Sequence, residues 1–279
     1  MAEISLAAEG EAAALVSRKM LRSRRKRVLM QIVLGIGFPC ALLIAWEALA
    51  TIGAIDRRFF PAPSETFMSM VKLLENPEER RRLLVDILAT YKRLVIGYGI
   101  GATLGIFIGV TMALLPAIRF SLSPLINATF PTPKLAIFPL LIVIFGLNDP
   151  SKIALVSVGV FYMTCIPTLS GVLHSNPLHY DVARAFKIPM WTRWFRIVLP
   201  AAMPSIVTGL KLGLGQALIL VVSAEIVSAQ EGLGHFIWDS WQVLNVSRMF
   251  IGLIVAGMTG AAAVIFGEFL ERRLVPWSH

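Results

Sequence analysis

The sequence is short of charged residues, cysteine and histidine. Only 15% of its 279 residues are charged, whereas soluble domains carry about 25%. The two cysteines, Cys40 and Cys165, lie inside apolar runs, so no disulfide framework is predicted. The four histidines are scattered, and we expect no metal site. Hydrophobic residues make up 56% of the chain and the mean hydropathy is +0.73, which indicates that lipid is its main solvent.

Nucleotide-binding and catalytic patterns are also missing. The chain has no G-x-x-x-x-G-K-[ST] phosphate loop, and no Ser/His/Asp set or carboxylate pair is placed for catalysis. We therefore predict that the protein is not an enzyme and that energy for any work comes from a partner. The net charge of +9 would indicate nucleic-acid binding in a soluble protein. In a membrane protein it indicates anchoring at the cytoplasmic face of the bilayer, with no nucleic acid.

Long apolar runs dominate the chain. A spanning helix needs about 20 apolar residues, and such runs must be helical because lipid cannot hydrogen-bond an open backbone. We therefore predict an all-α polytopic domain over residues 28–270, between a basic N-terminal segment (1–27) and a short tail (271–279). The six predicted spans are 28–55, 94–118, 120–147, 153–173, 197–229 and 249–267.

The connections between these runs carry their own signals. Residues 56–93 form a charged connection, within which 64–74 has the apolar spacing of a short amphipathic helix. In the third run, Pro131 and Pro133 are expected to break the helix, and such breaks often line a transport path, although a packing kink is the alternative. Residues 148–151 read as a turn. Residues 174–196 and 230–248 read as loops.

The distribution of basic residues favours cytoplasmic N and C termini. A cluster of basic residues stands directly before the first run, and such clusters stay on the cytoplasmic side. The cations of the 56–93 connection act against this orientation. The cluster consists of Arg22, Arg24, Arg25, Lys26 and Arg27.

Four glycines form a stripe along the second run. Gly97, Gly101, Gly105 and Gly109 recur every four residues, so they share one face of a helix. A stripe of this kind lets another backbone approach closely, which is how helices associate in lipid. The partner can be another helix of this chain or a second subunit.

The most specific motif lies in the loop before the fifth run. It reads Asp181-Val182-Ala183-Arg184-Ala185-Phe186-Lys187, followed by Ile197-Val198-Leu199-Pro200. The spacing resembles the cytoplasmic signature of ABC importer permeases, E-A-A-x3-G-x9-I-x-L-P. The chain departs from that pattern at Asp181, Val182 and Lys187, and a lysine adopts the turn after the motif less readily than the family's glycine does.

The same resemblance implies a role for this loop. In the family it forms a short helix that docks in a groove of the ATPase subunit. Ala183 and Phe186 are three residues apart and can share one face of such a helix, as a helix-in-groove contact requires. Pro200 can stand in the first turn of the fifth span.

Further motifs extend the resemblance over roughly residues 60–267. They are similar to motifs of permeases for nitrate, sulfonate, taurine and bicarbonate, which have a MetI-like core. The matching segments are 61–66 (PAPSET), 90–98 (TYKRLVIGY), 133–140 (PKLAIFPL), Phe145-Gly146, and Glu225 followed by Gly232-Leu233-Gly234.

The resemblance implies a set of partners and a mechanism. Two separate ATPase subunits would use ATP and Mg²⁺, and this chain would bind no cofactor itself. A second permease copy, giving a homodimer, and an extracytoplasmic solute-binding protein would complete an importer in the cytoplasmic membrane. The solute would be a small anion such as nitrate, sulfonate, taurine or bicarbonate, moved by alternating access.

Four charged residues lie inside apolar runs: Glu47, Lys134, Lys211 and Glu225. Such residues are expected to face the bundle interior or a water-filled path, so Lys134, Lys211 and Glu225 are candidates for the translocation path. Internal ion pairs are the alternative. Lys211 and Glu225 stand 14 residues apart on one helix, about 21 Å, so each would need a partner from another span or subunit.

Two other classes of protein remain open on the sequence. An ion-coupled secondary carrier would use Glu47 or Glu225 as a proton site, and a membrane scaffold would move no solute. Neither class needs the loop motif at its observed spacing.

Overall fold

The computed structural model describes residues 30–31, 33–174, 189, 192 and 194–276. Within these residues the regular structure is entirely helical, as predicted. The chain divides into two units, residues 1–68 and 69–279, and each is described by itself.

The first unit holds one long apolar helix and the start of a second. The first helix includes the candidate span Val33–Thr51, which lies inside the predicted run 28–55. Helix α2 (Pro63–Glu75) begins in this unit, where the sequence predicted an amphipathic helix. The carboxylate of Glu47 accepts hydrogen bonds from the hydroxyl of Ser64 at 2.7 Å and from its backbone N–H at 3.0 Å. Glu47 therefore satisfies a donor at the start of α2.

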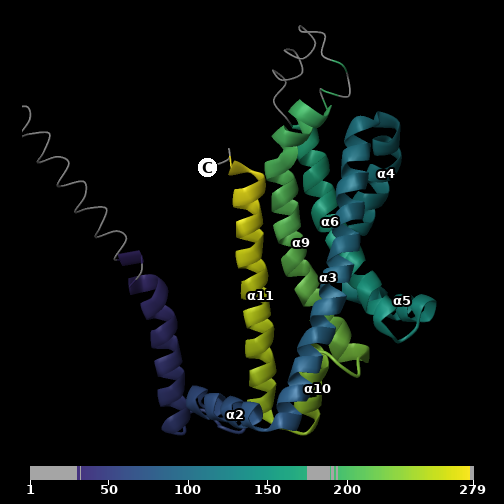
Figure 1. The fold of residues 1–279 in the computed structure, drawn as a ribbon. Helices are drawn as coiled ribbons and strands as arrows, with labels where there is room; N and C mark the ends of the chain where they lie inside the picture. The colour runs from purple at the N-terminus through teal and green to yellow at the C-terminus, as the bar shows by residue number, and fades with distance from the viewer. Residues whose placement is uncertain (1–29, 32, 175–188, 190–191, 193, 277–279) are drawn as a thin grey trace, which may run out of the picture. The chain divides into compact units, whose positions relative to one another are not determined.

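The second unit is a bundle of long helices, with the short α10 at one end and the short α5 projecting from its side (Figure 1). After α2, its elements are α3 (Pro77–Leu114), α4 (Pro116–Thr129), η1 (Lys134–Ile137), α5 (Phe138–Phe145), α6 (Asp149–Leu173), η2 (Trp194–Val198), α9 (Leu199–Ser228), α10 (Leu233–Gln242) and α11 (Val246–Leu274).

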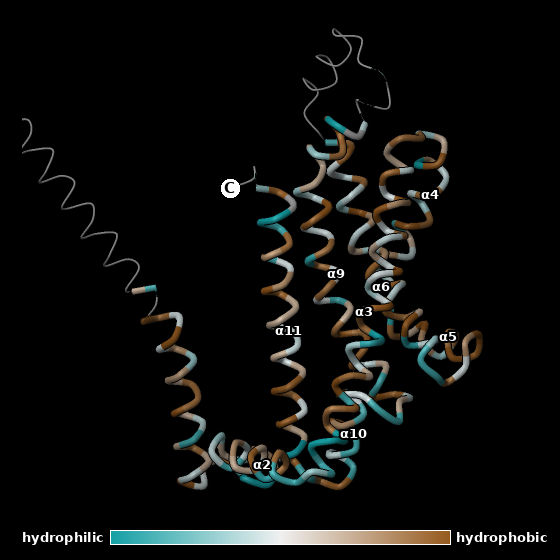
Figure 2. The backbone as a smooth tube through the Cα atoms, viewed as in Figure 1, coloured by the Kyte–Doolittle hydropathy of each residue, from teal (hydrophilic) through white to brown (hydrophobic). Residues whose placement is uncertain are grey.

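Five described helices are long and apolar enough to cross a membrane, or six if one bent pair counts as a single span. That pair comprises Pro116–Thr129 and Lys134–Phe145, which meet at 97°. The break falls at Pro131 and Pro133, as their missing backbone donors predicted. Apolar residues dominate the long helices, while hydrophilic residues gather around α10 and the start of α3 (Figure 2).

Several helix ends differ from the sequence expectations. Helix α3 begins at Pro77, so much of the expected connection 56–93 is helical, and it ends at Leu114. Its start is set by Asn76, whose side chain accepts a hydrogen bond from the N–H of Glu78. The expected turn at 148–151 is shorter, because α6 already begins at Asp149. The expected loop 230–248 contains α10.

Helix α3 is longer than the hydrocarbon layer of a membrane is thick. Its 38 residues extend about 57 Å at 1.5 Å per residue, whereas the hydrocarbon layer is about 30 Å thick. The helix is therefore longer than the apolar layer, and its charged first turns lie beyond the uncharged stretch that starts at Leu94.

The glycine stripe of α3 packs against α6 of the same chain. A Cβ atom on Gly97 would lie 2.7 Å from the Cβ of Val156, and one on Gly109 would lie 2.8 Å from the carbonyl oxygen of Cys165. Gly101 and Gly105 approach the same helix. Of the two partners that the sequence allowed, the described structure shows the intrachain one.

These contacts also give the directions of the helices. Along α3, positions 97 to 109 meet positions 156 to 168 of α6 in rising order, so the two helices run parallel. Helix α9 runs antiparallel to α6, because Ser205 lies beside Gly171 and Leu220 beside Gly159. The end of α6 and the start of α9 therefore lie at the same end of the bundle, where α11 also ends (Figure 1).

Candidate functional site and family

Glu225 lies at the centre of a buried polar network near the C-terminal end of α9. Its side chain is fully buried, and its carboxylate accepts hydrogen bonds from three residues. Nη1 of Arg93 donates at 2.7 Å, the hydroxyl of Thr90 at 2.9 and 3.0 Å, and the backbone N–H of Gly234 at 3.0 Å. The buried negative charge is therefore paired and hydrogen-bonded, the condition under which proteins tolerate such a group.

Arg93 joins the network to two further groups. Its Nε donates to the carboxylate of Asp149, the first residue of α6, at 2.7 Å. Its Nη1 also donates to the backbone oxygen of Glu231 at 2.7 Å. Lys92 holds the second oxygen of Asp149 at 3.1 Å. One arginine on α3 thus ties together the start of α6, the end of α9 and the segment before α10.

The start of α10 is held by side chains from α3 and α9. The backbone N–H of Gly232 donates to Asp86 at 2.8 Å, and that of Leu233 donates to the hydroxyl of Thr90 at 2.8 Å. With Gly234 bonded to Glu225, three successive N–H groups find partners that a helix start otherwise lacks.

Gly232 cannot be exchanged for a larger residue without disturbing this site. Its backbone adopts φ +126°, a conformation that side chains rarely allow, and an added Cβ would collide with the carboxylate of Glu225. The motif of Glu225 with Gly232-Leu233-Gly234 therefore meets the motif 90–98 in space, and the network is where they join.

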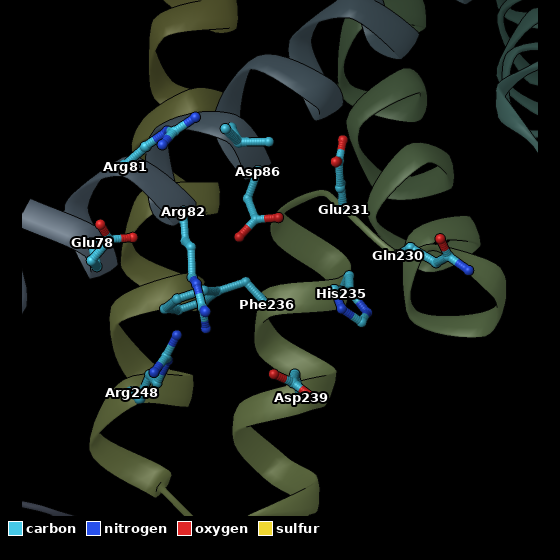
Figure 3. Close-up of a pocket in the computed structure, with 11 residues that line it drawn as sticks. Glu78, Arg81, Arg82, Asp86, Gln230, Glu231, His235, Phe236, Asp239 and Arg248 are labelled. Carbon is cyan, nitrogen blue, oxygen red and sulfur yellow. The ribbon is translucent and has the colours of Figure 1, made fainter.

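Two cavities flank the network. One of about 420 Å³ lies between the first turns of α3 and the helices α10 and α11. Figure 3 shows Arg82 and Arg248 reaching towards Phe236, with Asp86 beside them. The guanidinium of Arg248 lies 4.9 Å from the centre of the Phe236 ring and pairs with Glu79 at 3.5 Å. This cavity is lined by charges of both signs.

Arg93 itself lines the second cavity, of about 650 Å³. This cavity lies between the start of α6 and the segment that follows α9. Lys152 lines it and is only 2% exposed. Its ammonium donates to the backbone oxygens of Leu147 at 2.7 Å and Asn148 at 3.4 Å.

Lys211 and Lys134 do not belong to the network of Glu225 and have partners of their own. Lys211 pairs with Glu271 of α11 at 2.8 Å, which confirms that its partner comes from another span. The ammonium of Lys134 donates to the backbone oxygens of Thr129, Phe130 and Thr132 at 2.7–3.0 Å and lies 4.3 Å from the Tyr162 ring centre. Lys134 therefore caps the end of α4. Contact of Lys134, Lys211 or Glu225 with a solute stays a prediction.

The loop motif is only partly visible. Asp181, Val182, Ala183, Arg184, Ala185, Phe186 and Lys187 lie outside the described residues. Ile197 lies in η2, and α9 begins at Leu199 with Pro200 in its first turn, as the fixed φ of proline predicted.

Sequence reasoning missed Asp86, Thr90, Arg93, Asp149 and Lys152 as members of one site. Arg93 and Asp86 were assigned to a connection and Asp149 to a turn. A usable signal was present, because Asp86, Thr90, Arg93 and Gly97 follow each other at spacings of four, three and four. They therefore continue the glycine stripe on the same helix face.

Comparison with known proteins identifies the family of the chain. The family model for the binding-protein-dependent transport system inner membrane component matches residues 101–277, more than half of the chain. The chain belongs to this family. It is the membrane-spanning permease subunit of an ABC importer, a multi-pass membrane protein that works with ATPase subunits and is not an enzyme.

Named relatives of this permease share nearly its full length. The taurine transport system permease protein TauC of Escherichia coli is 29% identical over 94% of this chain and 97% of the relative. The nitrate import permease protein NrtB of Synechocystis is 28% identical over 84% of this chain and 86% of the relative.

Solved structures show the same fold. The permease resembles a chain of the MetNI methionine ABC transporter in an inward-facing conformation, with a TM-score of 0.63 at 16% identity over 71% of this chain and 99% of the other. An amino acid ABC transporter gives a TM-score of 0.59 at 19% identity, over 74% and 98%. The predicted MetI-like core is therefore confirmed, and the family decides for an importer over a secondary carrier or a scaffold.

Proposed function

We propose that this permease imports a small anion across the cytoplasmic membrane, driven by two separate ATPase subunits that bind the loop 174–196. The relatives named for taurine and nitrate support a solute with an oxyanion group, because taurine carries a sulfonate. ATP and Mg²⁺ are used by the ATPase subunits, and this chain binds no cofactor. A second identical permease copy and an extracytoplasmic solute-binding protein complete the importer.

The observation that carries the proposal is the direction of α6 and α9. These antiparallel helices precede and follow the loop in the chain, so α6 ends and α9 begins at the end of the bundle where α11 also ends (Figure 1). The buried network and α10 lie at the opposite end. With the termini in the cytoplasm, the ATPases act at one end and the solute enters at the other.

The proposed mechanism is alternating access. Closure of the ATPases on ATP moves residues 181–187, and α6 and α9 transmit the displacement because the loop joins them directly. Helix α9 carries Glu225, which is bonded to α3 and α10. The displacement therefore reaches the helices around the proposed entrance for the solute.

The test introduces a charge into the predicted contact. Ala183→Asp or Phe186→Asp places a carboxylate on the face that would enter the ATPase groove, so ATPase co-purification and solute-stimulated ATP hydrolysis should both fall while membrane insertion persists. Gln242→Asp is the matched control, because it adds the same charge at an exposed residue of α10 at the opposite end. Unchanged ATPase binding in both loop variants would overturn the proposal.

Orientation has its own test. A cysteine introduced at Arg184 should react with a membrane-impermeant maleimide only after the cells are opened, whereas one at Gln242 should react in intact cells. The reverse pattern would place the loop outside the cell, where no ATPase can reach it.

A further inference from the structure

Lys152 lacks the partner that a buried cation normally has. Its side chain is almost fully buried, yet both of its hydrogen bonds go to neutral backbone oxygens. No ion pair within 4.0 Å joins it to a carboxylate among the described residues. Buried charges are normally paired, so this site has an electrostatic deficit that a nearby anion would remove.

Two further donors belong to residues that line the same cavity of about 650 Å³ and have no partner among the described residues. The hydroxyl oxygen of Ser228 is buried and has no hydrogen-bond partner. Nη2 of Arg93 makes no hydrogen bond among the described residues, although Nε and Nη1 do. A buried hydroxyl without a partner, such as that of Ser228, is rare in proteins and calls for an explanation.

The carboxylates around the cavity differ in how far they offset its positive charge. Asp149 is already bound on both oxygens, by Arg93 and Lys92. Glu231 lines the cavity, but its side chain is exposed to solvent, where water screens its charge. Glu225 is buried next to Arg93, but Arg93 and Thr90 already bind its carboxylate. The charge of Lys152 is buried too, and no carboxylate of the described residues lies within ion-pair distance of it.

We propose that this cavity is an anion-binding site, in which Lys152, Arg93 and the hydroxyl of Ser228 hold a sulfonate, carboxylate or similar oxyanion group. The cavity lies at the end of the bundle opposite the loop motif, so an anion bound there stands at the mouth of the permease. Identifying this anion with the transported solute rests on the proposed function. Binding itself depends only on the residues of the cavity.

The site can be tested by the charge preference of a thiol reagent. Ala229 lines the cavity beside Ser228, and Ala229→Cys adds little volume. In a Cys40→Ser background, the purified full-length permease in detergent is treated with the sulfonate reagent MTSES or the cationic reagent MTSET. Rates are normalised to those of free 2-mercaptoethanol. A positive cleft concentrates anions by about tenfold or more, so MTSES should be favoured by that factor, and sodium methanesulfonate should slow its reaction more than sodium chloride does.

Matched variants separate this site from the general charge of the surroundings. Lys152→Gln keeps a donor for the backbone oxygens but removes the charge, so the preference for MTSES should disappear. Glu231→Gln should increase it. Arg80→Gln removes an exposed cation of α3 that does not line the cavity and should change little. An unchanged preference in Lys152→Gln, or an equal loss in Arg80→Gln, would overturn the proposal.

The experiment is independent of the importer assignment. It needs no ATPase, no binding protein and no defined orientation, so failure of the loop-motif tests leaves its outcome unaffected. A charge preference that depends on Lys152 would therefore establish the anion site even if the transported solute proved to be different.

Discussion

The contact between α3 and α6 changes character along its length. From Gly97 to Gly109 the helices touch through glycine, with apolar groups and backbone of α6 opposite. One turn earlier on the same face, Arg93 pairs with Asp149 and Glu225. In the apolar layer there is no hydrophobic force between helices, so close packing by small residues takes its place. Where the helix leaves that layer, charged groups specify the contact instead.

Breaking the ion pairs at the charged end of this contact should reduce stability the most. Glu225→Ala leaves Arg93 with one fewer buried partner and the N–H of Gly234 without its acceptor, so we expect a loss of about 3–5 kcal/mol of stability, typical of a broken buried ion pair. Thermal unfolding in detergent, followed by circular dichroism, measures the change. The double variant Arg93→Ala/Glu225→Ala should lose less than the sum of the single changes. Strict additivity would show that the two side chains are not coupled.

The glycine face should give an intermediate effect, and the helix supplies its own control. Gly101→Ala forces a Cβ atom against the backbone of Ser157, and overpacking of this kind costs about 1–3 kcal/mol. Gly99 lies on the same helix with no atom within 4 Å of an added Cβ, so Gly99→Ala should be neutral or slightly stabilising. Equal unfolding temperatures for the two variants would contradict the observed packing of α3 on α6.

The exposed edge of the network should give the smallest effect. Lys92 pairs with Asp149, but its side chain is 63% exposed, and exposed ion pairs contribute about 0–1 kcal/mol. Lys92→Ala should therefore shift the unfolding temperature little, and added salt should abolish the remaining difference. A loss as large as that of Glu225→Ala would mean that Asp149 depends on Lys92 rather than on Arg93.

Much of the fold could be predicted from sequence because its signals are local. Apolar runs predicted the long helices, the spacing of four predicted the packed glycine face, and Pro131 and Pro133 predicted the break between α4 and α5. The intramembrane position of Lys211 also predicted a partner on another helix, which is Glu271.

The network could not be predicted because its contacts are distant in sequence. Thr90 and Arg93 meet Glu225 across more than 130 residues, and no periodicity reports such a pairing. Arg93 also stands just before the uncharged stretch that starts at Leu94, where a cation is ordinarily interpreted as a solvent-exposed residue. Lys152 has the same ambiguity at the start of α6, since its burial depends on the packing of the neighbouring helices.

The parallel packing of α3 on α6 has a mechanical consequence. The two helices are in contact over several turns and are joined at one end by Arg93. They therefore resist sliding past each other far more than either helix alone resists bending. Any push applied where α6 ends must then tilt the pair as one stiff body, and a small rotation there becomes a wide sweep at the far tip of the much longer α3.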